Sequence, residues 1–193
     1  MAIIEVKNLS KIYGAGDTCV TALDSINLIV EQGQFVAVMG PSGCGKSTLL
    51  HLIGGLDRPT SGTITIEGKD LSTLGDTELT ELRRRKMGFI FQFFNLIPVL
   101  DAVENTALPL ILDGVKPEEA RSKAREWLKH NKLEERSSHR PDELSGGQQQ
   151  RVAISRAMVA DPLIVLADEP TGNLDSRSGD EIASSLRKIV SDW

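Results

Sequence analysis

The sequence predicts an α/β fold in which a helical subdomain is set into a parallel-sheet core. Short apolar runs at 35–39, 87–91 and 163–167 have the length and composition of buried parallel strands. Between the last two runs, residues from about 100 to 160 show mostly helical spacing of apolar residues. Strands, then helices, then a strand again is the order typical of a helical piece inserted into an α/β domain.

The remaining elements follow from local patterns along the chain. Residues 3–9 and 21–30 are predicted strands, and a third strand at 63–67 follows a turn that contains Pro and Gly. Helical spacing covers 46–53, 76–86 and 177–192, and it begins again at Pro117. No internal repeat or low-complexity linker divides the 193 residues, so a single domain is expected.

Composition argues against several classes of protein. The chain carries 22 Lys and Arg against 27 Asp and Glu, a net charge of −5, which argues against nucleic acid as the main partner. The basic run at 83–86 is expected to lie on a solvated helix face or to pair with the acids before it. Two isolated cysteines predict no disulfide framework and fit a reducing cytosol. The N-terminus is unlike a signal peptide, and no apolar run reaches the roughly 18 residues of a membrane span.

Residues 40–47 match GxxxxGK[ST], the pattern of a phosphate-binding loop, between a predicted strand and a predicted helix. Glycines let backbone N–H groups surround phosphate oxygens, and the positive end of the following helix points at the same oxygens. Lys46 is predicted to reach the β- and γ-phosphates, and Ser47 to hold Mg²⁺. The candidate nucleotide-binding residues of this segment are Gly40, Ser42, Gly43, Cys44, Gly45, Lys46, Ser47 and Thr48.

An acidic pair follows the apolar run at 163–167. Asp168 and Glu169 are expected at the carboxyl end of a strand, which is where open α/β sheets bind ligands. Asp168 is the predicted Mg²⁺ ligand, and Glu169 is predicted to orient and polarise the attacking water. A helix N-cap pair before Pro170 is the competing interpretation. The phosphate loop by itself leaves kinases, GTPases and ATPases open.

The segment Leu144-Ser-Gly-Gly-Gln148 resembles the signature sequence of ABC ATPases without a mismatch. Its surroundings, with residues 91–98 and 167–175, are similar to the lipoprotein-release and macrolide-export branch of that family. The resemblance extends from Ile3 to Trp193. It implies a P-loop NTPase core of the RecA-like type, with an N-terminal antiparallel β subdomain and an inserted α-helical subdomain at about 93–160.

The resemblance also assigns roles to single residues. In the family, two subunits pair head to tail, and the signature motif of one caps the γ-phosphate held by the other. The signature residues here are Ser145, Gly146, Gly147 and Gln148. Tyr13 matches the aromatic that stacks on adenine, Gln92 the glutamine that senses Mg²⁺ and the attacking water, and Asp175 the loop that crosses between subunits. Plainer interpretations stay open: a capped helix start, a core or surface tyrosine, a loop glutamine and a helix N-cap.

The function expected from the resemblance is ATP binding and hydrolysis that energise a membrane transporter of the exporter or lipoprotein-release type. Catalysis is assigned to Glu169, Gln92 and Lys46, with ATP and Mg²⁺ as cofactors. The expected metal ligands are Ser47, Gln92 and Asp168. A second copy of this chain and transmembrane permease subunits are the expected partners, and nucleic acid is not. The expected location is the cytoplasm, at the inner face of the cell membrane.

One departure from the family pattern keeps alternatives open. The family places a histidine one strand beyond the acidic pair, whereas His51, His130 and His139 all precede it. Residues 1–193 are therefore expected to form a single nucleotide-binding domain that lacks the final strand and the switch-histidine region. The alternatives are an ATP-binding module that does not hydrolyse, a soluble ABC ATPase outside transport, and a small-molecule kinase or GTPase.

Two hypotheses concern local surfaces. Apolar residues between 93 and 112 either include a docking surface for a transmembrane partner or form the core of the helical subdomain, and Leu96→Glu is the proposed test. Cys44 lies near Lys46 and a helix start, which favour a thiolate, although an inert small residue is the alternative.

Overall fold

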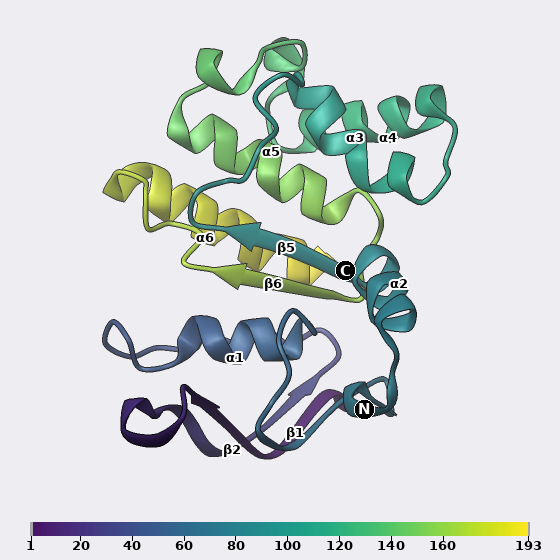
Figure 1. Cartoon of the computed structure of the whole chain (residues 1–193). Helices are drawn as coiled ribbons and strands as arrows, with labels where there is room; N and C mark the ends of the chain where they lie inside the picture. Colours follow the sequence, from purple (N-terminus) through teal and green to yellow (C-terminus); the bar gives the residue numbers. More distant parts are fainter. Residues whose placement is uncertain (1, 193) are drawn as a thin grey trace. The chain divides into compact units, whose positions relative to one another are not determined.

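The structure is a computed structural model that describes residues 2–192 (Figure 1). The chain divides into two compact units. The first contains the residues up to Thr80 together with the segment from Arg187 onward, and the second spans Glu81–Leu186. The boundaries fall inside helix α2 (Asp76–Lys86) and helix α6 (Ser176–Asp192).

The first unit is built on an antiparallel sheet in the order β2-β1-β3-β4. Its strands are β1 (Ala2–Tyr13), β2 (Val20–Glu31), β3 (Ser61–Ile66) and β4 (Lys69–Asp70). Alternate apolar residues of β1 and β3 are buried, as expected for a sheet with one covered face. Helix α1 (Lys46–Ile53) contacts β2 (Figure 1). The antiparallel subdomain expected from the resemblance is therefore confirmed.

The strand predicted at 35–39 is absent, and this prediction is wrong. Neither sheet formed by residues 2–192 includes this run, and Phe35, Val36 and Val38 are exposed. An apolar run becomes a strand only where a neighbouring strand offers complementary N–H and C=O groups. The sequence pattern of 35–39 shows that the run is apolar, but it does not show whether a neighbouring strand is available for pairing.

The second unit contains the parallel strands β5 (Met87–Phe91) and β6 (Ile164–Asp168), which form at the other two predicted core strands. Helix α5 (Gly146–Met158) packs on β5. The two backbones approach closely, because a Cβ atom at Gly88 would lie 2.5 Å from the carbonyl oxygen of Ala157. The strand pair joins chain segments that lie before and after the helical region.

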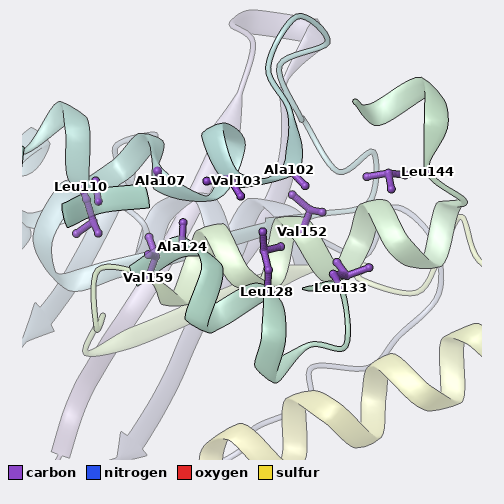
Figure 2. Close-up of a cluster of buried hydrophobic side chains, with 11 residues drawn as sticks. Ala102, Val103, Ala107, Leu110, Ala124, Leu128, Leu133, Leu144, Val152 and Val159 are labelled. Carbon is purple, nitrogen blue, oxygen red and sulfur yellow. The ribbon is translucent and has the colours of Figure 1, made fainter. Parts of the chain in front are cut away.

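Helices α3 (Ala102–Leu112) and α4 (Pro117–His130) pack with α5 around a shared apolar core. Figure 2 shows the buried side chains of this core. They are Ala102, Val103, Ala107, Leu110, Ala120, Ala124, Leu128, Leu133, Leu144, Val152 and Val159. Helix α3 begins at a capping box in which the Asp101 carboxylate accepts from the Glu104 N–H at 2.7 Å. The boundaries of about 93–160 for a helical subdomain stay a prediction.

Single 3₁₀ turns complete the secondary structure, at Gly16–Thr18, Leu71–Thr73, Glu134–Arg136 and Pro141–Glu143. The basic run at the end of α2 pairs with acids. Arg85 Nη1 lies 2.7 Å from Glu81 Oε1, and Arg85 Nε lies 2.9 Å from Asp113 Oδ1. None of the helices formed by residues 2–192 is both long enough and apolar enough to cross a membrane.

Candidate functional site

The phosphate-binding loop leads into α1, and its path requires glycine. Gly45 precedes the first turn with a φ of 92°, and a Cβ atom there would lie 2.4 Å from the carbonyl oxygen of Ala22. Gly40 is confined as well, because a Cβ atom would lie 2.6 Å from Cys44 Sγ. No side chain of the described residues caps α1. A glycine-rich loop that ends at such a helix N-terminus is suited to bind phosphate.

Lys46, the first residue of α1, lies folded over the loop. Its Nζ donates to the carbonyl oxygens of Gly40 and Pro41 at 3.0 Å each and lies 4.0 Å from Cys44 Sγ. Phosphate oxygens compete well for such an ammonium group, because hydrogen bonds between two charged groups are stronger than those to neutral carbonyls. The structure therefore places Lys46 inside the loop that is predicted to hold phosphate. Cys44 is exposed beside it, and the reactivity of its thiol stays a prediction.

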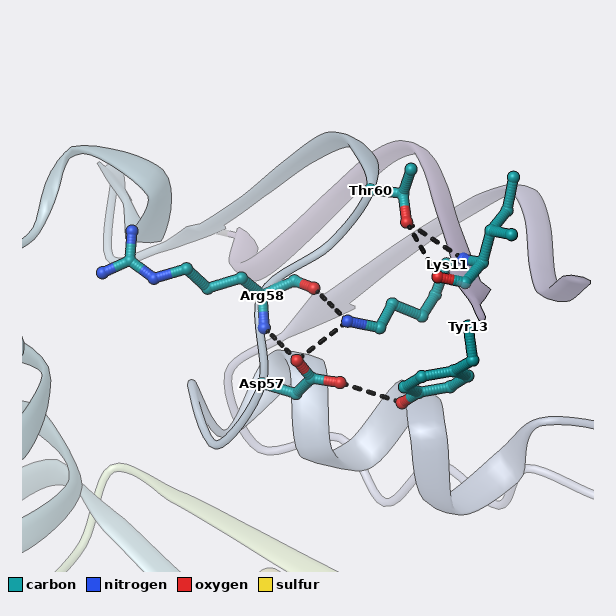
Figure 3. Close-up of polar contacts among 6 residues, drawn as sticks. Lys11, Tyr13, Asp57, Arg58 and Thr60 are labelled. Carbon is teal, nitrogen blue, oxygen red and sulfur yellow. Dashed lines mark hydrogen bonds and ion pairs between the residues drawn. The ribbon is translucent and has the colours of Figure 1, made fainter. Parts of the chain in front are cut away.

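Tyr13 stands at the end of β1 and is 42% exposed, which argues against the core role that the sequence left open. Its hydroxyl donates to Asp57 Oδ2 at 2.9 Å. Lys11 Nζ lies 4.7 Å from the centre of the Tyr13 ring and donates to Asp57 Oδ1 at 2.8 Å and to the Arg58 carbonyl oxygen at 2.7 Å (Figure 3). Tyr13 is therefore held by side chains from β1 and from the segment after α1.

The charges of this cluster follow from its contacts. Burial and the Asp57 carboxylate raise the pKa of Tyr13, whereas the hydroxyl of Thr48 acts in the opposite direction. The hydrogen bond from Lys11 lowers the pKa of Asp57. Tyr13 is thus neutral and Asp57 ionised at neutral pH. The contact with Thr48 in the first turn of α1 brings the predicted adenine contact beside the predicted phosphate site, within the first unit.

In the second unit, β5 and β6 end side by side. Phe91 and Asp168 are register partners, so Gln92 and Glu169 follow at the same edge. Gln92 Nε2 donates to Asn173 Oδ1 at 3.3 Å, and Asn173 Nδ2 donates to the Gln92 carbonyl oxygen at 3.0 Å. Glu169 has a φ of 44°, a left-handed conformation that costs a residue with a side chain about 1–2 kcal/mol. The structure thus gathers three of the four residues predicted for Mg²⁺ and water, namely Gln92, Asp168 and Glu169.

The signature segment forms the start of α5. Ser145 Oγ accepts from the Gln148 N–H at 3.4 Å, and Gln148 Oε1 accepts from the Ser145 N–H at 2.9 Å, which makes a capping box. A Cβ atom at Gly146 or Gly147 would have its nearest neighbour at 3.5 or 3.4 Å, an ordinary contact distance. Neither glycine has a positive φ. The fold of this chain therefore does not require glycine at these two positions.

Asp175 caps α6. Its Oδ1 accepts from the Ser178 N–H at 3.0 Å, and the hydrogen bonds from Ser178 lower its pKa. The N-cap interpretation is thus what the structure shows, and the crossing between subunits stays a prediction. The N-cap interpretation of Asp168 and Glu169 is wrong, because the helix that follows them begins only at Ser176.

Two polar residues of α5 that the sequence analysis missed hold the neighbouring loops. Arg156 donates to the carbonyl oxygens of Asn95 and Phe94 at 2.6 and 2.7 Å, and burial lowers its pKa. Gln150 is fully buried and donates to the Pro170 carbonyl oxygen at 2.6 Å. The available signal was helical phasing, since both side chains lie at positions of α5 that the apolar pattern marks as covered.

The loop between β5 and α3 exposes apolar side chains on a well-held backbone. Phe93 and Val99 are each 72% exposed. The buried side chain of Asn105 fixes this backbone, because its Oδ1 accepts from the Ile97 N–H at 2.7 Å and its Nδ2 donates to the Ile97 carbonyl oxygen at 3.1 Å. Leu96, by contrast, packs against the helical core. The docking hypothesis and the core hypothesis therefore apply to different residues of the segment.

The residues assigned to Mg²⁺ supply the donors that this ion prefers. Ser47 offers a hydroxyl, Gln92 an amide oxygen and Asp168 a carboxylate. Among the residues from 2 to 192 there is no group of three or more His, Cys, Asp or Glu side chains that could hold a metal ion. Mg²⁺ usually binds a small number of protein ligands and takes its remaining oxygens from substrate phosphates and water. The donor types of these three residues suit Mg²⁺, and their role as its ligands stays a prediction.

Comparison with known proteins gives a consistent result. A family model described as "ABC transporter" matches residues 23–172. The chain is 51% identical over 191 residues to the ABC transporter ATP-binding protein MJ0796 of Methanocaldococcus jannaschii, covering 97% of this chain and 81% of the relative. It is 50% identical over 188 residues to the lipoprotein-releasing system ATP-binding protein LolD of Geobacter metallireducens, covering 97% and 84%.

Two solved structures of MJ0796 have the same fold. A dimeric post-hydrolysis state bound to ADP and Pi aligns with a TM-score of 0.88 at 48% identity, covering 98% of this chain and 83% of that chain. A second dimeric structure aligns with a TM-score of 0.89 at 49% identity over the same shares of the two chains.

Proposed function

Since this chain belongs to the ABC transporter family, we propose that it acts as a dimer, docks on transmembrane subunits at the inner face of a membrane and powers a lipoprotein-release type of transport. Membership makes the chain an ATP-binding subunit with the P-loop ATPase fold, as its signature motif predicted. It also sets aside the kinase and GTPase alternatives. The single observation that carries the dimer is the pair of glycine-rich helix starts at α1 and α5, only one of which needs glycine for its own fold.

The reaction is the attack of water on the γ-phosphate of ATP. Lys46 and the N-terminus of α1 neutralise charge on the phosphates, and Tyr13 stacks on the base. Glu169 accepts a proton from the attacking water, and Gln92 orients that water. Ser47, Gln92 and Asp168 would hold Mg²⁺ together with the phosphates, and the bound ion would neutralise phosphate charge. The left-handed backbone at Glu169 supports this role, since strained residues gather at active sites.

A dimer accounts for the glycine-rich start of α5. Gly146 and Gly147 place no side chain at the start of α5, although a methyl group would fit there. Bare N–H groups at a helix start suit the close approach of an anion. We assign that anion to the γ-phosphate held by the phosphate loop of a second copy. The solved structures of MJ0796 are dimeric, which supports the pairing of two copies.

Measuring the rate of MgATP hydrolysis across protein concentrations tests the proposal, with Glu169→Gln as the blank. A specific rate that rises with concentration and then levels off is expected, because two copies complete each site. The non-hydrolysing alternative holds instead if the protein binds ATP without turnover above the blank. A specific rate that does not depend on concentration would contradict the dimer.

The docking surface is tested at Phe93 and Val99, not at Leu96. The variant Val99→Glu is expected to abolish binding to detergent-solubilised transmembrane subunits of the same transporter and to leave the free energy of unfolding nearly unchanged, because its side chain is exposed. The control is Ile29→Glu on β2, which replaces a similarly exposed apolar residue. Equal partner binding by both variants would contradict the docking surface.

A further inference from the structure

We propose that Asp57 and Lys11 are positioning residues that hold the Tyr13 ring as a fixed platform for the base of the nucleotide. The proposal rests on the proposed ATP-binding function and adds two residues that no motif of the sequence contains. The observation behind it is a shared carboxylate. One oxygen of Asp57 accepts from the Tyr13 hydroxyl at 2.9 Å, and the other accepts from Lys11 Nζ at 2.8 Å (Figure 3).

The carboxylate anchors the far end of the ring. A half-exposed tyrosine at the end of a strand is free to change χ1 and χ2 unless its hydroxyl is held. Asp57 is itself fixed, because its Oδ1 also accepts from the Arg58 N–H at 2.7 Å. The strand end is fixed too, since the Thr60 hydroxyl accepts from the Ile12 N–H at 3.0 Å. Backbone and side chain together therefore set one orientation of the ring.

Lys11 decides which face of the ring is available. Its side chain is only 12% exposed, and its ammonium lies 4.7 Å from the ring centre, a cation–π distance. The ammonium is bonded to Asp57 and to the Arg58 carbonyl oxygen, so its charge is matched locally. One face of Tyr13 is thus taken by Lys11. The opposite face is the one left for a base to stack on.

The expected effect is on the base and not on the phosphates. Immobilising one side chain at binding reduces affinity by about 2- to 12-fold, and a ring that is already fixed avoids this loss. The variant Asp57→Ala should therefore weaken MgATP binding by about 2- to 12-fold. Binding of magnesium tripolyphosphate, which has no base, should not change. Asp57→Asn, which keeps an acceptor for the Tyr13 hydroxyl, should recover part of the loss.

The test combines these variants with changes in the ring. Equilibrium titrations with MgATP and with magnesium tripolyphosphate are made on the whole chain for wild type, Asp57→Ala, Tyr13→Ala and the double variant. Once the ring is absent, Asp57→Ala should cause no further loss of MgATP affinity. Asp76→Asn is the matched control, because Asp76 pairs with the Arg58 guanidinium on the surface, whereas Asp57 and Lys11 contact only the Arg58 backbone.

Each outcome has one meaning. Wild-type protein that is folded by circular dichroism and binds no MgATP contradicts the proposed function. Wild-type binding with equal losses for MgATP and tripolyphosphate in Asp57→Ala overturns the positioning role and leaves the function intact. An undiminished effect of Asp57→Ala in the Tyr13→Ala background overturns it as well. Should Asp57→Ala fail to fold, Tyr13→Phe gives the same reading, because it removes the hydroxyl bond and keeps the ring.

Discussion

The starts of α1 and α5 carry similar glycine-rich sequences and are built by different means. The start of α1 depends on backbone conformation and close backbone packing. Gly45 has a positive φ, and a Cβ atom at this position would lie 2.4 Å from the Ala22 carbonyl oxygen. The start of α5 depends on side-chain hydrogen bonds. The side chains of Ser145 and Gln148 each accept from the other residue's backbone N–H, and Gly147 has room for a methyl group. Glycine at α1 is therefore needed to fold, whereas glycine at α5 is not.

This contrast distinguishes a structural glycine from a functional one. A structural glycine resists substitution in any assay of folding. A functional glycine tolerates substitution in folding and fails only when a ligand or partner must approach.

Gly45→Ala is expected to lower the free energy of unfolding by about 3 kcal/mol or more, because left-handed strain costs about 1–2 kcal/mol and overpacking costs about 1–3 kcal/mol. Urea denaturation measures the change. Gly43→Ala is the control, because Gly43 also has a positive φ while no atom lies within 4 Å of its Cβ position. It should lose about 1–2 kcal/mol from strain alone. Equal losses would mean that the contact with Ala22 is unimportant.

Arg156→Met is expected to cost about 2–3 kcal/mol, because it leaves two carbonyl oxygens without their charged donor. Thermal unfolding monitored by circular dichroism measures the loss. Arg177→Met on α6 removes an exposed arginine whose ion pair with Glu181 is 3.5 Å long. That control should change stability by less than about 1 kcal/mol. A similar cost for both arginines would show that side chains do not hold the α5 region as described.

Glu169→Gly is expected to raise the free energy of unfolding by about 0.5–1 kcal/mol, because relief of left-handed strain exceeds the added chain entropy. Hydrolysis should nevertheless be lost together with the carboxylate. Asp161→Gly provides the control, since Asp161 has a φ of 49° just beyond α5 and takes no part in the proposed chemistry. It should gain similar stability and keep its hydrolysis rate. Full activity in Glu169→Gly would remove Glu169 from the reaction.

Gly147→Ala is expected to change stability least, by a gain of up to about 1 kcal/mol from helix propensity. Its hydrolysis rate should fall at least tenfold at saturating protein concentration, because a methyl group would block the anion. Gly179→Ala in the first turns of α6 is the matched control, with its nearest neighbour at an ordinary 3.6 Å. It should keep the rate. A loss of stability in Gly147→Ala would mean that this glycine is structural after all.

Local patterns predicted much of the fold. The helix at 46–53, the helix at 76–86 and the strand at 87–91 form within the predicted limits, because their periodicity and their flanking residues are encoded nearby. The run at 35–39 was wrong for the opposite reason, since a strand depends on a distant partner. The comparisons confirm the fold class and the family that the signature segment indicated.

The candidate site was predictable where a motif carried it. Lys46 and Glu169 could be named from short patterns, and their functional roles stay predictions. Asp57 and Arg156 could not be named in this way, because each acts through a partner that is remote in sequence: Asp57 holds Tyr13, and Arg156 holds Asn95. A linear pattern records the residue type and not the partner that folding brings to it.

The pairing of β5 with β6 has a consequence for how the protein is made. Strand β5 leaves the ribosome well before its only described neighbour, because all of 92–163 is translated between them. At about 5–20 residues per second, this delay amounts to roughly 4–14 s. During that time the helices α3 and α4, whose contacts are local, can fold and shorten the loop that must close. Early folding of α3 and α4 therefore lowers the entropy cost of closing the loop between β5 and β6.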